Sequence, residues 1–221
     1  MAKSALVEHR PWLMAAVIAA IGFYVLKNGT LGELFLIPIK GAACVFLALY
    51  ALRRSSHSDA KLLALFLGLS ALGDMGIMFD LQLGGALFFA AHLAGLSLFL
   101  RNLRKTHAPS QKGLGVALLL GTPFISWVIS GDWQVALYSL ALGGMAASAW
   151  MSRFPRYRVG IGAVLFVFSD WLIFAEMSVL ANSPIPDLAI WPLYFLAQFL
   201  IATGVVQTLR GEHPDTAQPA S

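Results

Sequence analysis

Charged residues are scarce in this chain of 221 residues: they make up 12% of it, whereas hydrophobic residues make up 58%. Soluble domains carry about 25% charged residues, so the composition excludes an ordinary soluble domain. The single cysteine excludes an internal disulfide. The sequence also lacks a G-x-S-x-G nucleophile elbow, an H-E-x-x-H zinc pair, a P-loop and a dinucleotide fingerprint. The chain instead has long apolar segments with a few polar residues inside them.

Eight apolar segments fill most of the chain, and each is close to the ~20 residues that a membrane-spanning helix requires. We therefore predict an all-α, polytopic transmembrane bundle of eight helices, forming one domain over residues 1–210, in a bacterial inner membrane. Residues 211–221 are polar and contain proline, and we expect a disordered tail there. The predicted helices are about 11–26, 34–52, 62–79, 81–100, 114–130, 133–151, 159–180 and 188–209.

The lysines and arginines predict the orientation of these helices. With eight spans, 13 of the 15 basic residues fall on one side, in the N-terminal segment, alternate loops and the tail. The other side has only Lys27 in a loop, and Lys40 lies within a helix. Basic loops face the cytoplasm, so we expect both termini to be cytoplasmic. The net charge of +4 is this orientation signal, and we expect no nucleic-acid partner.

Two aspartates, Asp74 and Asp170, lie inside predicted helices, where an unpaired charge costs ~2.5–3.5 kcal/mol on insertion scales. Such residues normally face a protein interior or a water-filled cavity and indicate a functional site. At ~1.5 Å per residue, six polar groups from five helices reach overlapping depths, and we expect one polar cavity in the outer half of the bundle. These groups are Asp74, Asp170, Lys40, His92, Tyr194 and Gln198. Two further candidates are Ser169, before Asp170, and Asp80, at the tight turn between two helices.

Each of these residues also has a structural interpretation. An aspartate in a membrane helix could cap a neighbouring helix or pair with Lys40, and Lys40 alone could extend toward the membrane surface. His92 could be a hydrogen-bonded core residue. Gln198 and Tyr194 could serve only to hold helices together.

Two carboxyl groups in a low-dielectric site are suited to acid–base chemistry. Burial disfavours the charged form of a carboxyl group and a nearby cation favours it, so two carboxyls in different surroundings can divide the roles of acid and base. Glycosidases use such a pair with oxocarbenium-like transition states.

Four blocks of sequence resemble the YhhN family of eight-helix membrane proteins. In chain order they are ALGDMGIMF, GALFFAAHLAG, GAVLFVFSDWLIF and YFLAQFLIATG, and Lys40 in IPIK resembles a lysine of the family's second helix. The resemblance spans roughly residues 36–207. The chain has Gly76 and Gly95 where the family often has a bulky aliphatic residue and a tyrosine. We expect both glycines to widen the pocket.

The resemblance implies a lysoplasmalogenase, which hydrolyses the sn-1 vinyl ether bond of a lysoplasmalogen to a fatty aldehyde and glycerophosphoethanolamine or glycerophosphocholine. It implies Asp74 and Asp170 as the catalytic pair, without cofactor or metal. The expected partners are the lysophospholipid substrate and membrane lipid, with no obligate protein partner. We assign Asp170, the deeper residue, as general acid and Asp74, nearer Lys40, as the ionised partner. An exchange of these roles stays open.

Three other functions stay open. Intramembrane Asp, Lys and His residues also occur in ion- or proton-coupled carriers of small molecules or lipids, although carriers tend to have helices broken at mid-membrane. A lipid-binding or regulatory membrane protein would keep the pocket without the chemistry. A metal-dependent lipid hydrolase would use Asp74, Asp170 and His92 as ligands, an unusual set for a metal.

Overall fold

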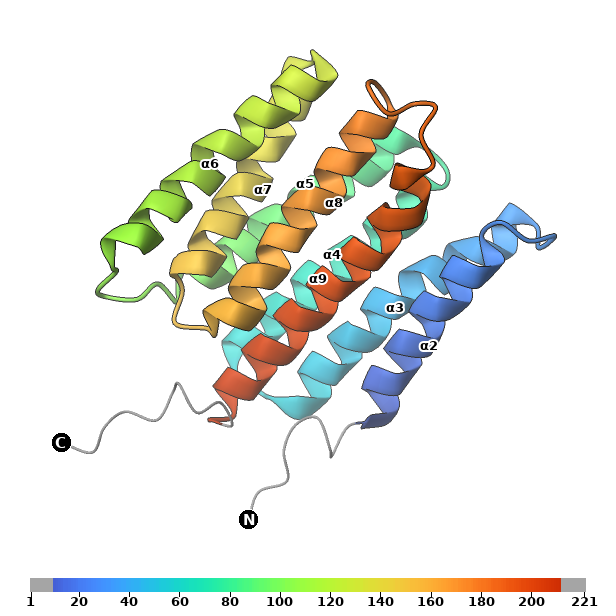
Figure 1. Ribbon diagram of the computed structural model, residues 1–221. Coiled ribbons are helices and arrows are strands. Elements are labelled where there is room, and N and C mark those ends of the chain that lie inside the picture. The colour runs from blue at the N-terminus through green and yellow to red at the C-terminus, as the bar shows by residue number, and fades with distance from the viewer. Residues whose placement is uncertain (1–9, 212–221) are drawn as a thin grey trace. The chain divides into compact units, whose positions relative to one another are not determined.

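Helices make up the regular structure of the protein in a computed structural model that describes residues 10–211 (Figure 1). The predicted polar tail therefore lies, from residue 212 on, outside the described residues. Within the described range there are eight α-helices and no β-strand. They are α2 (Arg10–Leu26), α3 (Glu33–Arg54), α4 (Ser58–Ile77), α5 (Leu81–Leu100), α6 (Pro109–Ser130), α7 (Trp133–Met151), α8 (Ile161–Glu176) and α9 (Ile185–Leu209), with a π-helical turn η1 (Arg156–Gly160) before α8.

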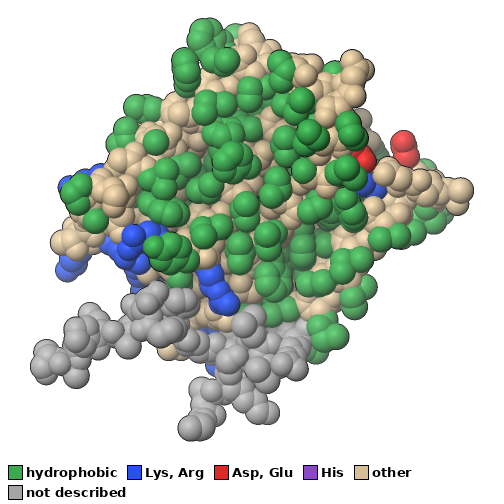
Figure 2. Space-filling model, viewed as in Figure 1, with side chains coloured by type: hydrophobic (Ala, Val, Ile, Leu, Met, Phe, Trp, Pro, Cys, Tyr) green, Lys and Arg blue, Asp and Glu red, His purple; other side chains and the backbone are tan. Residues whose placement is uncertain are grey.

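Six of these helical segments are long and apolar enough to cross a membrane: α3, α4, α5, α6, η1 with α8, and α9. Helix α2 is apolar but has 17 residues. Helix α7 is not among the six, and its residues 141–149, most of them small, are all buried. The side chains on the visible face are mostly hydrophobic (Figure 2). The chain is therefore a multi-pass membrane protein.

The chain forms two compact units. Unit 1 comprises the residues through Ala94 and those from Ile201, so it contains α2, α3, α4, most of α5 and the end of α9. Unit 2 (Gly95–Leu200) contains the end of α5, then α6, α7 and α8, and the first part of α9. In unit 1, α3 packs against both α2 and α4. In unit 2, α6 and α7 pack together and α8 contacts both.

Most helix ends lie close to the bounds predicted from the sequence, and the larger differences have local causes. Helices α5 and α7 have the predicted bounds, 81–100 and 133–151. Helix α4 starts before the apolar segment because its first turn is polar and capped by His57, whose ring Nδ1 accepts a 3.1 Å hydrogen bond from Asp59 N. Helix α6 starts early with Pro109, a residue favoured in the first turn because it lacks an N–H.

The segment predicted as one helix over 159–180 is shorter at its C-terminal end. Helix α8 ends at Glu176, and the next six residues form turns although they remain largely apolar. Asp170 is therefore six residues from the end of its helix, and Asp74 is three residues from the end of α4. Both carboxyl groups lie closer to a helix end than the hydropathy pattern predicts.

Candidate functional site

Asp74 is a buried carboxyl group of unit 1, with an exposed fraction of 2%. Helix α3 approaches this part of α4 closely at Gly41, where a Cβ atom would lie 2.9 Å from Met75 Cγ and 3.1 Å from the carbonyl oxygen of Ala71. The residue before Gly41 is Lys40, which is half-buried and interacts electrostatically with Asp74. The packing of α3 on α4 therefore brings the Lys40 amine into electrostatic interaction with the carboxyl group.

Helix α5 adds an imidazole to unit 1. The approach of α5 to α4 is close at Gly73, where a Cβ atom would lie 2.8 Å from Phe88 Cδ2. The Phe88 ring stacks on His92, with centroids 6.5 Å apart and planes at 26°. Ser70 lies one turn before Asp74 and His92 one turn after Phe88, so the antiparallel helices bring the hydroxyl and the imidazole to about the same level. Both side chains are fully buried.

Gly76 serves helix packing. A Cβ atom there would lie 3.1 Å from Gly84 Cα and 3.1 Å from Leu87 Cδ1, so α5 fills the space that a side chain would take. The expectation that Gly76 widens the pocket is therefore wrong, because its small size allows α5 to approach. For Gly95 the same expectation stays a prediction.

Asp80 lies in the turn between α4 and α5 and is exposed. Its Oδ1 accepts a 2.8 Å hydrogen bond from Leu83 N in the first turn of α5. This is the geometry of a helix N-cap, which satisfies an otherwise unpaired backbone donor. The structure thus gives Asp80 a capping role.

Asp170 is the buried carboxyl group of unit 2, with an exposed fraction of 3%. The hydroxyl of Tyr138 on α7 donates a 2.7 Å hydrogen bond to its Oδ2, and the Ser169 hydroxyl lies 3.5 Å from its Oδ1. The Tyr138 ring packs edge-to-face on Phe174, one turn after Asp170, with centroids 5.9 Å apart. The Phe174 contact and the hydrogen bond to Asp170 together fix the direction of the phenol.

Tyr138 was not among the residues expected from the sequence. It lies five residues after the start of α7, and Asp170 lies six residues before the end of α8. These two helix ends are at the same end of unit 2 because α7 and α8 run in opposite directions (Figure 1). Tyr138 can be identified by comparing its depth with that of Asp170, because both lie five or six residues from helix ends on the same side of unit 2.

Helix α9 brings Tyr194 and Gln198 into unit 2. The Tyr194 ring packs edge-to-face on Phe166, one turn before Asp170, with centroids 5.3 Å apart. Because α9 runs opposite to α8, Gln198 lies one turn further from Asp170 than Tyr194 does. Gln198 is fully buried, and neither its Oε1 nor its Nε2 has a hydrogen-bond partner. An unsatisfied buried amide costs ~1–3 kcal/mol, which makes Gln198 a candidate for binding a polar group.

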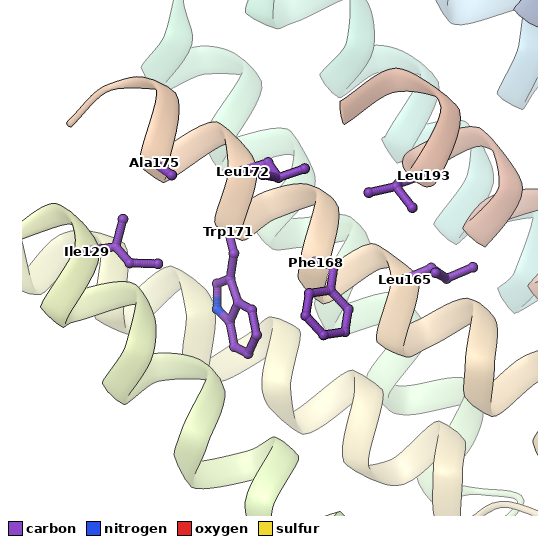
Figure 3. A pocket seen from close by; sticks show the side chains of 7 residues that line it. All are labelled: Ile129, Leu165, Phe168, Trp171, Leu172, Ala175 and Leu193. Atoms are coloured by element: carbon purple, nitrogen blue, oxygen red, sulfur yellow. The ribbon is translucent and has the colours of Figure 1, made fainter. Parts of the chain in front are cut away.

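An apolar groove of about 340 Å³ also lies in unit 2. Figure 3 shows its lining from α6, α8 and α9: Ile129, Leu165, Phe168, Trp171, Leu172, Ala175 and Leu193. At 3.6 residues per turn, Asp170 lies about 200° around α8 from Phe168. The groove therefore belongs to the face of α8 opposite the carboxyl group and is not part of the carboxyl site.

The expected constellation is thus found as two groups, one in each unit. Lys40, Asp74 and His92 belong to unit 1, whereas Ser169, Asp170, Tyr194 and Gln198 belong to unit 2. Across residues 10–211, no three His, Cys, Asp or Glu side chains are grouped so that they could hold a metal ion.

The comparison with known protein families gives one result, a match of residues 35–205 to the model of the YhhN family. No curated protein and no solved structure matches the chain. The family match covers well over half of the 221 residues and includes both groups of polar residues described above. The chain therefore belongs to the YhhN family.

Proposed function

We propose that this membrane protein is a lysoplasmalogenase, which hydrolyses the sn-1 vinyl ether bond of lysoplasmalogens with Asp74 and Asp170 as its catalytic carboxyl groups. Membership of the YhhN family, which includes hydrolases, supports an enzyme of this class. The observation that carries the proposal is the burial of two carboxyl groups beside different partners. Asp74 interacts with the Lys40 ammonium, and Asp170 accepts a hydrogen bond from the Tyr138 phenol.

Hydrolysis of a vinyl ether requires two carboxyl groups with different catalytic roles. A proton is transferred to the β-carbon of the vinyl ether, which gives an oxocarbenium ion. Water then adds to the carbon that bears the ether oxygen and loses a proton. The resulting hemiacetal collapses to a fatty aldehyde and the free hydroxyl group of the glycerophosphate product. One carboxyl group must therefore give a proton, and a carboxylate must stabilise the cation and take a proton from water.

The surroundings of the two carboxyl groups support a division of these duties. We assign the charged role to Asp74 because it lies near the Lys40 ammonium. We assign the acid role to Asp170, whose Oδ2 is held by Tyr138, so that Oδ1 carries the proton to the substrate. The buried His92 and Gln198 would orient water or the lipid head group.

The proposal includes eight spans with both termini in the cytoplasm of a bacterial cell. In unit 1, Arg210 Nη1 donates a 3.3 Å hydrogen bond to Arg54 O, so α3 and α9 end on the same side. In unit 2, the end of α5 is bonded to the end of α7 through Arg153 N and Asn102 O, 2.7 Å apart. These pairings support the alternating path on which the orientation rests.

The test is turnover by purified protein in detergent. An sn-1 alkenyl lysophospholipid and its acyl counterpart are supplied, and aldehyde release is measured with and without a chelator. We expect aldehyde from the alkenyl lipid alone, with or without chelator, and its loss in Asp74→Asn and Asp170→Asn. Asp132→Asn is the matched control, because Asp132 is an exposed cap of α7 and asparagine caps equally well.

Other outcomes would point to other functions. No aldehyde from a folded, monodisperse sample would refute the proposal and favour a carrier or a lipid-binding protein. A carrier is not favoured by the described helices, because α3, α6 and α9 continue through Pro38, Pro123 and Pro192 without a break. Activity that disappears with chelator would make the protein a metal-dependent hydrolase. Full turnover in Asp170→Asn would contradict the acid assignment alone.

A further inference from the structure

The charged residues of unit 2 are sorted to its two ends. Its exposed acidic side chains lie at the start of α7, the end of α8 and the start of α9: Asp132, Glu176 and Asp187. Its basic residues lie at the opposite end, around the end of α5, the start of α6, the end of α7 and η1. They are Arg101, Arg104, Lys105, Lys112, Arg153, Arg156 and Arg158. Within residues 95–200, all of which are described, no acidic residue lies at the basic end.

Hydrogen bonds join the two basic loops into one surface. Arg104 Nε donates to the carbonyl oxygen of Ser152 at 2.9 Å, and Arg153 Nε donates to Asn102 Oδ1 at 2.6 Å. The backbones are also paired, since Leu103 and Ser152 form an antiparallel bridge. An orientation signal requires only that basic residues be present in a loop. Here the loops are held in a fixed arrangement, which is what a binding surface requires.

Apolar side chains extend from the same surface. Tyr157, in the π-helical turn η1, is 79% exposed, and Leu103 is 39% exposed. Tyrosine is enriched at the level of lipid head groups, where its ring meets apolar chains and its hydroxyl meets water. Lysine and arginine beside such a residue attract anionic head groups. The combination matches the boundary of a membrane that contains anionic lipid.

We propose that this surface, formed by residues 101–105 and 153–158 and called here the basic surface, binds the head groups of anionic phospholipids. The ligand chemistry is a phosphate diester without a compensating ammonium group, held at the end of unit 2 by Arg101, Lys105 and the residues of η1. A nucleic acid would offer the same phosphates, but the exposed Tyr157 and Leu103 on a membrane-spanning unit favour a lipid.

The experiment compares two lipids with identical brominated acyl chains, phosphatidylglycerol and phosphatidylcholine, by quenching of tryptophan fluorescence in mild detergent. We expect the native protein to bind phosphatidylglycerol about tenfold more tightly than phosphatidylcholine. The double variant Arg101→Gln/Lys105→Gln should lose most of this preference. The matched control Arg53→Gln/Lys61→Gln removes the same charge from exposed positions of unit 1 and should keep it.

Three results of this comparison would overturn the proposal. Equal affinities for the two lipids would remove the basis for an anionic site. If both double variants lost the preference for phosphatidylglycerol equally, the lipid would be attracted by the net charge of the protein and not by the basic surface. Competition by inorganic phosphate at the same concentration would identify a site for free phosphate. A salt titration of the native protein needs no variant: the preference for phosphatidylglycerol should fall as ionic strength rises, and a constant preference would also contradict the proposal.

Discussion

The hydroxyl of Tyr138 donates a 2.7 Å hydrogen bond to Asp170 Oδ2 and so joins α7 to the helix that carries the proposed acid. A hydrogen bond between a phenol and a protonated carboxyl group joins two neutral groups and contributes ~0.5–1.5 kcal/mol. We expect Tyr138→Phe to lower kcat roughly two- to tenfold with a smaller change in KM, measured as aldehyde release from the alkenyl lipid. Tyr24→Phe removes the same hydroxyl group from α2 and should leave kcat unchanged. Native kcat in Tyr138→Phe would exclude a catalytic part for this hydrogen bond.

Lys40 and Asp74 should behave as a coupled pair. Because the ammonium interacts with the carboxylate, Lys40→Met and Asp74→Asn remove the same interaction, and their effects on kcat/KM should not add. We expect a coupling free energy of about 0.5–3 kcal/mol in a double-mutant cycle. The control cycle pairs Asp74→Asn with Lys61→Met, thirteen residues and ~20 Å away along α4. Additive effects in the first cycle would show that the two groups act separately.

Gly73 is expected to tolerate no side chain. A Cβ atom there would lie 2.8 Å from the Phe88 ring, which is itself stacked on His92. We expect Gly73→Ala to lower the free energy of unfolding by about 1–3 kcal/mol. Gly68→Ala on the same helix has no neighbouring atom within 4 Å and should raise stability by up to ~1 kcal/mol. Unfolding in detergent measures both variants, and equal stabilities would contradict the close approach of α5 to α4.

Gln198 should show opposite effects on stability and activity. Its amide is fully buried without a hydrogen-bond partner, so Gln198→Met should raise the free energy of unfolding by about 1 kcal/mol or more. If the amide orients water or substrate, the same variant should lose turnover. Gln207→Met on the same helix replaces a buried residue that has an interaction partner, and we expect it not to be stabilising. A Gln198→Met protein that is both more stable and fully active would assign the residue no part in the reaction.

The sequence predicted the eight helices because each apolar run is close to the length of a membrane span. Hydropathy could not locate the end of α8, since Met177, Val179 and Leu180 continue the apolar pattern after the backbone has left the helix at Glu176. Hydropathy also could not locate the start of α4, because its first turn is polar and is capped by His57.

The candidate site was predicted in part. Charged residues inside apolar helices are conspicuous, so Asp74 and Asp170 could be identified from their positions in the sequence. Tyr138 was missed, because a tyrosine near a helix end is common in membrane proteins and it stands out only when its depth is compared with that of Asp170. The role of Gly76 depends on how close α5 lies to α4. The sequence pattern of one helix does not predict its distance from another helix.

The composition of unit 1 has a consequence for biogenesis. Its helices come from the residues through Ala94 and from Ile201 onward, so the 106 residues of unit 2 are synthesised between its two parts. At ~5–20 residues per second, the ribosome needs roughly 5–20 s to bridge that interval. During this time the segment that carries Asp74 is already made, while the last turns of α9 and the Arg210–Arg54 hydrogen bond do not yet exist. A chain arrested at Leu200 would hold every residue of unit 2 but an unfinished unit 1, which should make that nascent form a substrate for membrane quality control.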